Sequence, residues 1–135
     1  AYSNKLHTIH IPAGFTAGRI MDILIEVNVA EEESKFGISC DEAGDLVREC
    51  AKLHNIHVCG LMTIAPFVEN CEENRQYFKK LKQLCVDLKA KNIDNTDMDV
   101  LSMGMTGDYQ VAIEEGATMV RVGTGIFGAR NYNVQ

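Results

Sequence analysis

The chain has 135 residues, a formal net charge of −6 and a hydrophobic fraction of 46%. This composition is typical of one globular domain and excludes disordered, collagen-like and coiled-coil chains. The acidic excess argues against nucleic acid or an anionic membrane as the main partner, because phosphates are bound through lysine and arginine. No apolar run approaches the ~20 residues that cross a bilayer. The first residues do not have the pattern of a signal peptide, and five cysteines without CxxC spacing indicate reduced thiols, so we expect a cytoplasmic protein.

Strand-like and helix-like segments alternate along the first half of the chain. Residues 23–29 predict a strand that is covered on both faces. Ser39 and Glu42 predict a capping box at the start of the next helix, which should end near residue 55. A second strand is expected over residues 57–64, and Asn70 is a weaker start signal for the longest helix.

The second half of the chain continues this alternation. Residues 98–103 predict a third strand, residues 108–115 a short helix closed by Gly116, and residues 118–122 a fourth strand. Strands that alternate with helices are typical of βα units, so the sequence predicts an α/β fold with a parallel sheet.

The last two predicted strands both run into glycine-rich turns that carry hydroxyl groups, residues 102–108 and residues 123–128. Glycine lets backbone N–H groups approach an anion closely, and a helix that begins just afterwards adds its own free N–H groups. In (β/α)8 barrels the loops after strands seven and eight often bind phosphate. A phosphate-bearing ligand is therefore one interpretation. The other, left equally open by the spacing alone, is that the glycines only turn the chain.

Arg121 lies inside an apolar run, two residues before Gly123. A buried guanidinium without a partner is costly, so we expect Arg121 to face an anion, a ring acceptor or a carboxylate. An internal salt bridge to Glu26 is the alternative. Glu26 and Asn28 share one face of the first predicted strand, where they could hold a ligand or satisfy one another.

A metal site is not expected from the sequence. Cys50, His54, His57 and Cys59 lie close together in the chain, but their spacing fits no closed zinc pattern. His54 falls at a predicted helix end and His57 at a strand start, so their side chains need not converge. Neither a Gly-x-Ser-x-Gly elbow nor a P-loop is present, and we identify no catalytic residue.

Three segments resemble the pyridoxal 5′-phosphate (PLP) homeostasis proteins, which are single-domain barrels related to the N-terminal domain of alanine racemase. The segments are ILIEVNVAEEESKFGIS, GLMTIAP and LSMGMTGDYQVAIEEGATMVRVGTGIFGARNY, and the resemblance runs from about Met21 to Tyr132. It implies a parallel (β/α) fold of the TIM-barrel type. It also implies a cytosolic, non-catalytic carrier of PLP that takes part in vitamin B6 homeostasis.

The same resemblance implies which residues would bind the cofactor. Arg121 would lie near the pyridine nitrogen and leave it unprotonated, which weakens the electron sink that PLP enzymes use. Met62 would line the ring pocket, and Asn28 is a further candidate for contact with the ligand. Thr106 stands where the family usually has serine, a change that keeps the hydroxyl group. The phosphate would be bound by Ser102, Gly104, Met105 and Thr106, with Gly123 and Thr124 opposite.

Only about the later half of the family's barrel corresponds to this chain, since family members have roughly 220–250 residues, the usual size of a complete barrel. The lysine that bonds covalently to PLP lies on the family's first strand, ahead of the residues present here, and none of the eight lysines lies inside an apolar strand. We therefore expect non-covalent PLP binding at most. Residues 21–135 are assigned to the partial barrel. Residues 1–20 are an irregular segment: either they form no neighbouring parallel strand, or the chain is a truncated, rearranged or engineered fragment.

Half a barrel has two open sheet edges and an uncovered apolar interior, so a homo-oligomer that covers this face is expected. Two other functions remain open from the sequence. One is a fragment of an alanine-racemase-type PLP enzyme. The other is a ligand-free structural or oligomerising fragment, which would leave the glycine-rich turns without phosphate or sulfate.

Overall fold

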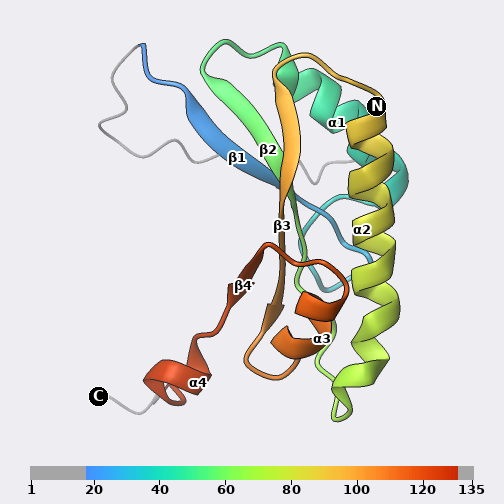
Figure 1. The fold of residues 1–135 in the computed structure, drawn as a ribbon, viewed down its shortest axis with the longest axis vertical. Helices are drawn as coiled ribbons and strands as arrows, with labels where there is room; N and C mark the ends of the chain where they lie inside the picture. The colour runs from blue at the N-terminus through green and yellow to red at the C-terminus, as the bar shows by residue number, and fades with distance from the viewer. Residues whose placement is uncertain (1–17, 131–135) are drawn as a thin grey trace.

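The computed structural model describes residues 18–130, which form a four-stranded parallel sheet with helices packed against one face (Figure 1). The strand order β1-β2-β3-β4 follows the chain, and neighbouring strands pair in parallel. The predicted α/β class with a parallel sheet is confirmed, whereas most of the segment 1–20 lies outside the described residues. The elements are β1 (Met21–Glu26), α1 (Cys40–Ala51), β2 (Ile56–Met62), the 3₁₀ helix η1 (Cys71–Asn74), α2 (Arg75–Ala90), β3 (Thr96–Met105), α3 (Tyr109–Glu114), β4 (Met119–Arg121) and the single turn α4 (Thr124–Phe127).

The local start and stop signals act largely as predicted. Ser39 Oγ accepts a hydrogen bond from the backbone N–H of Glu42, and the Glu42 carboxylate accepts one from the N–H of Ser39, which confirms the capping box. Gly116 closes α3 with a φ of +94°, as its predicted role requires. Asn70 caps η1 instead of α2, because its side chain accepts from the N–H of Glu72 and the chain makes a 3₁₀ turn before the long helix begins.

The ends of several elements differ from the predicted positions for tertiary reasons. β1 ends at Glu26, since the chain after the isolated bridge of Val27 turns into a loop that the Asn28 side chain closes. α1 ends at Ala51, four residues before the predicted end. β3 is longer than predicted, because Thr96 already pairs with Val58 of β2.

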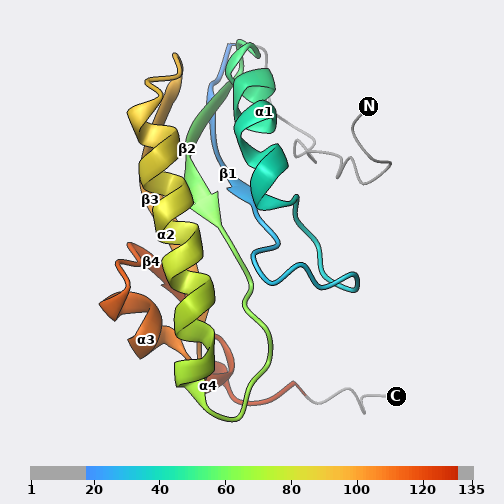
Figure 2. The ribbon, with the colours of Figure 1, turned by 90° about the vertical axis from the view of Figure 1, so that its right-hand side faces the viewer.

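The core lies between the sheet and the helices α1 and α2, which run side by side on one face of the sheet (Figure 2). Alternate residues of the strands point into this layer, and residues three and four apart on α2 meet them. Burial of these apolar side chains fixes which face of the sheet is covered. Fully buried members include Val47, Val58, Leu61, Phe78, Leu81, Leu88, Leu101 and Met103.

The opposite face of the sheet has no helix packed on it within the described part of the chain. Because Ile23 and Ile25 point into the core, the alternate residues Asp22, Leu24 and Glu26 of β1 point to this inner face. β1 and β4 are the two edge strands. None of the helices in residues 18–130 combines the length and the apolar character that crossing a bilayer requires.

Gly60→Ala should destabilise the protein strongly, because a methyl group on Gly60 collides with the backbone carbonyl of Val100 on β3. Both strands are central, so neither backbone can move aside without breaking their pairing. We expect the free energy of unfolding to fall by about 3 kcal/mol, measured by urea unfolding followed by circular dichroism. Gly107→Ala is the control, since a methyl group there meets no atom within 4 Å. Equal losses in both variants would contradict the prediction.

Candidate functional site

The two glycine-rich turns meet at the carboxyl ends of β3 and β4. Thr106 lies in the turn after β3, and its Oγ1 is 3.0 Å from Oγ1 of Thr124 in the turn after β4. The backbone N–H of Gly125 donates to the same Thr106 oxygen at 3.1 Å. The structure therefore brings the two segments together, and the hydroxyl group of Thr106 joins them.

Three glycines in these turns have different surroundings. A side chain on Gly125 would place its Cβ 2.9 Å from Cγ2 of Thr106 and push the two turns apart. Gly104 has a φ of +92°, and a Cβ there would lie 2.6 Å from Cβ of Ala112 on α3. At Gly123 nothing lies within 4 Å of the position a Cβ would take, and the residue is exposed. The site therefore combines two tightly packed glycines with one accessible backbone segment.

Arg121 lies beside these turns at the end of β4 and is half-buried. One terminal nitrogen of its guanidinium donates to Oγ of Ser102 on β3, and the other donates to the carbonyl oxygen of Thr63 at 2.7 Å. Burial lowers the pKa of Arg121, while the negative charges of Glu26 and Asp108 act in the opposite direction. The alternative of a direct salt bridge to Glu26 is not what the structure contains, since no ion pair of Arg121 is formed within residues 18–130.

Met62 and Ser102 are register partners on β2 and β3, and Glu26 on β1 is the register partner of Met62. These three residues therefore form a row across the sheet, with Arg121 close to its far end. Ser102 is buried, with 2% of its surface exposed. Asn28 has a local role: its amide donates to the carbonyl oxygen of Glu32 at 2.8 Å and accepts from the N–H of the same residue.

Asp108 and Asn74 hold the turn after β3, and sequence reasoning did not place either of them in the site. Oδ1 of Asp108 accepts from the N–H of Met105 at 2.7 Å, and Oδ2 accepts from the amide of Asn74 at 2.8 Å. Asn74 also donates to the carbonyl oxygen of Pro66, and only 1% of its surface is exposed. From the sequence, Asp108 could be identified only as the first residue of a predicted helix. The role of Asn74 depends on contacts between distant segments that no local pattern records.

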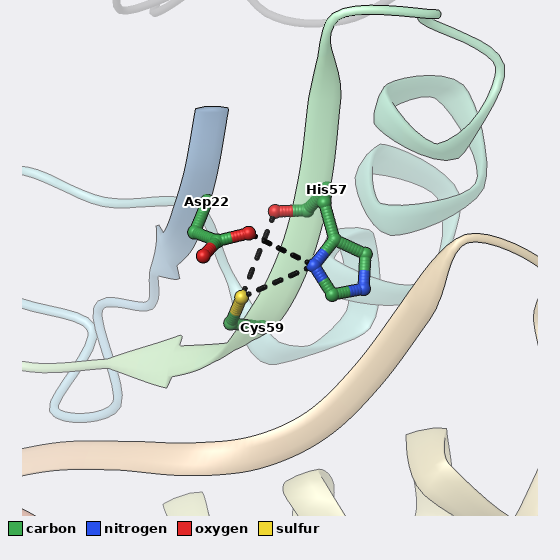
Figure 3. Close-up of side chains that lie close together, drawn as sticks. All are labelled: Asp22, His57 and Cys59. Carbon is green, nitrogen blue, oxygen red and sulfur yellow. Dashed lines mark hydrogen bonds and ion pairs between the residues drawn. The ribbon is translucent and has the colours of Figure 1, made fainter. Parts of the chain in front are cut away.

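The four residues weighed for zinc do not assemble as a set. Cys50 lies on the buried face of α1, and His54 lies in the exposed turn after that helix. His57 and Cys59 do converge, and they do so together with Asp22 of the neighbouring strand (Figure 3). Spacing along the sequence could not predict that Asp22, on another strand, lies beside His57 and Cys59.

Comparisons with known proteins agree with this architecture. The family model for the N-terminal domain of alanine racemase matches residues 8–131. The pyridoxal phosphate homeostasis protein of Aquifex aeolicus is 48% identical over 113 residues, which cover 84% of this chain and 49% of that protein. The chain spans about half the length of the curated relatives it matches.

Solved structures show the same correspondence. A crystal structure of an unknown protein from Bifidobacterium adolescentis has a TM-score of 0.76 and 40% identity, over 82% of this chain and 44% of that one. PipY of Synechococcus elongatus with PLP bound has a TM-score of 0.70 and 27% identity, over 82% of this chain and 50% of that one. Together with the four parallel strands, these similarities confirm the predicted half of a (β/α) barrel.

Asn74→Ala should loosen the turn after β3, because it removes the hydrogen bond to Asp108 and the hydrogen bond to the carbonyl oxygen of Pro66 in the segment after β2. We expect the free energy of unfolding to fall by about 2 kcal/mol and the amide of Met105 to exchange its hydrogen faster. Hydrogen exchange with chemical denaturation measures both effects. Asn70→Ala is the control, since Asn70 is exposed and caps only η1. Unchanged exchange at Met105 in Asn74→Ala would contradict the proposed role.

Proposed function

Because the chain belongs to the family of alanine racemase N-terminal domains, we propose that it binds PLP through the turns after β3 and β4 and acts in PLP homeostasis without catalysing a reaction. The observation that carries the proposal is the junction of the two turns at Thr106. Its hydroxyl oxygen accepts a hydrogen bond from the N–H of Gly125 and lies beside the hydroxyl group of Thr124. A related PipY structure contains PLP, and curated relatives are named pyridoxal phosphate homeostasis proteins.

The residues at the junction fit a phosphate group. Thr106 and Thr124 offer hydroxyl groups, and the open space around Gly123 lets its backbone reach an anion. The neighbouring guanidinium of Arg121 supplies a positive charge that no carboxylate contacts within the described residues. Such a set of neutral donors with one nearby cation is suited to a phosphate ester. Ser102, Gly104 and Met105 complete the proposed phosphate side of the site.

The proposed role of Arg121 also explains why the protein would carry PLP without using it in catalysis. PLP supplies, when bound, a reactive aldehyde and an electron sink whose strength depends on a protonated ring nitrogen. A guanidinium does not give up its proton in proteins, so Arg121 beside that nitrogen would hold it unprotonated. Met62, in the row next to Ser102, would contact the ring. Asn28 remains a candidate for ligand contact only if its bonds to Glu32 open.

The binding we propose is non-covalent, because none of the described lysines lies on a strand of the sheet. Lys35, in the loop after β1, donates from Nζ to the carbonyl oxygen of Ala65 at 2.9 Å. Lys80 is paired with Glu31, and Lys89 lies on α2, away from the strand ends. We place this function in the cytoplasm, since all five cysteines are free thiols.

Thr106→Val should weaken PLP binding about tenfold, because it removes one hydrogen-bonding group at the phosphate. Thr106→Ser is the matched control and should bind like the wild type, since the hydroxyl group is kept. Titration followed by PLP absorbance, with inorganic phosphate as a competitor, measures the affinities. Equal binding by Thr106→Val and the wild type would contradict the assignment of the site.

Borohydride treatment of the PLP complex tests the non-covalent mode separately. We expect intact mass spectrometry to find no stoichiometric adduct, and a racemase assay with alanine to give no turnover above the protein-free rate. A reduced adduct at one specific lysine would contradict non-covalent binding, and enzymatic turnover would favour the racemase-type alternative.

We further propose that a second copy of the chain covers the inner face of the sheet. Met119 of the edge strand β4 is 48% exposed and shares this face with its register partner Ser102. Within residues 18–130 no further strand pairs with β1 or β4. Unpaired edges and exposed apolar side chains favour association.

Light scattering coupled to gel filtration should therefore give a multiple of the 15.0 kDa chain mass. Met119→Lys should shift the protein towards the monomer, because a charge at this face opposes burial. Phe67→Ser is the control, since Phe67 is exposed in the loop after β2. A well-folded wild-type monomer would contradict the proposal.

A further inference from the structure

A second group of polar side chains lies at the opposite end of the sheet, where the strands begin. Asp22 on β1 and His57 on β2 are register partners, and Asp97 lies at the start of β3. Cys59 follows His57 by two residues on the same strand and points to the same face. Figure 3 shows that the side chains of Asp22, His57 and Cys59 point toward one another. Three chemically different metal-binding groups therefore meet at one place.

The separations between these groups are those of ligands around one small ion. Nδ1 of His57 is 3.0 Å from Oδ1 of Asp22 and 3.4 Å from Sγ of Cys59, and the three ligand atoms all lie within 4.8 Å of one another. In tetrahedral zinc sites the bond lengths are about 2.0 Å to nitrogen or oxygen and about 2.3 Å to sulfur, which places neighbouring ligand atoms roughly 3.3 to 3.6 Å apart. The ligand atoms need only small movements to bind such an ion.

Asp97 orients the imidazole ring from its other side. Oδ2 of Asp97 is 3.4 Å from Nε2 of His57. In the metal-free protein Nδ1–H of His57 donates to Asp22. When a metal ion replaces that proton on Nδ1, the carboxylate of Asp97 would hold the remaining ring proton on Nε2. Metal-binding histidines usually have such a partner on the nitrogen that does not bind the metal, so the surroundings of His57 match those of a ligand.

The charge balance also favours a cation. Burial, the hydrogen bond with Asp22 and the negative charges of Asp22, Asp97 and Asp99 all raise the pKa of the Cys59 thiol. In the described part of the chain, no lysine or arginine forms an ion pair with Asp22 or Asp97. A divalent cation would neutralise these carboxylates and stabilise the thiolate at the same time.

We propose that Asp22, His57 and Cys59 bind zinc or a similar divalent transition metal, with Asp97 as a positioning residue. Zinc would take a carboxylate oxygen of Asp22, Nδ1 of neutral His57 and the thiolate sulfur of Cys59, while the thiol proton passes to solvent. A water molecule would fill the fourth position. The mixture of oxygen, nitrogen and sulfur ligands favours zinc over magnesium or calcium, which bind oxygen alone. Asp22 is 75% exposed, so the ion can reach the site from solvent.

The test uses the whole reduced chain, freed of metal with a chelator and carrying no histidine tag. Titration with zinc against a chromophoric chelator should give one strong site per chain. Cobalt(II) should produce a thiolate charge-transfer band in the near ultraviolet and the visible bands of a four-coordinate ion. Cys59→Ser should abolish the thiolate band, and Asp97→Asn should weaken zinc binding 10- to 100-fold.

The controls are Cys71→Ser and His54→Gln, which remove the same chemical groups outside the cluster and should leave both readouts unchanged. Cys59→Ser is nearly isosteric at a partly exposed position, and circular dichroism reports whether it folds. Absence of a one-to-one zinc complex in the wild type would overturn the proposal. It would mean that His57 only forms a hydrogen bond with Asp22 and an ion pair with Asp97. A thiolate band that persists in Cys59→Ser would also overturn it.

Discussion

The guanidinium of Arg121 ties the last strand to the two strands before it, and the position of the candidate PLP site depends on this link. β4 has three residues and two register pairs with β3, which is little backbone pairing to fix a strand. The hydrogen bonds of the Arg121 side chain to Ser102 and to the carbonyl of Thr63 add to this backbone pairing and fix the position of β4. Because Gly123 follows two residues later, the same bonds also place the turn that reaches Thr106.

This link has an electrostatic cost that the structure leaves partly uncompensated. Burial disfavours the charged guanidinium, and neutral oxygens supply its described hydrogen bonds. An anion beside Arg121 would recover part of that cost, so ligand binding and the stability of β4 are expected to reinforce one another. The guanidinium on the inner face is therefore accounted for by its role in holding β4.

Local patterns predicted the elements and the convergence of the two turns, because both depend on short-range rules. Ser39 and Glu42 are three residues apart, which is the spacing that a capping box needs, and parallel strands necessarily end at one edge of a sheet. The partners of Arg121 could not be predicted in the same way. From the sequence, Arg121 was expected to face an anion, a ring acceptor or a carboxylate, with Glu26 as the alternative partner. Its hydrogen bonds to the hydroxyl of Ser102 and the carbonyl of Thr63 depend on how distant segments are placed in the fold. Asn74 and Asp22 were missed for the same reason, since their roles arise from contacts with distant segments.

The two proposed sites use opposite ends of the same face, and a register shift between Val58 and Gly60 keeps His57 and Met62 on that face. Along β2, His57 and Met62 are five residues apart, about 17 Å of extended strand. That distance exceeds the screening length of about 8 Å at physiological ionic strength, so a cation at one end affects an anion at the other only weakly. The polar groups of the inner face are concentrated at the two ends of the strands, and the apolar residues Leu24 and Val100 lie between these ends. The inner face can therefore bind a cation at one end and an anion at the other. Failure of zinc to bind near His57 would accordingly leave the argument for PLP at Thr106 intact, and the converse holds for the same reason.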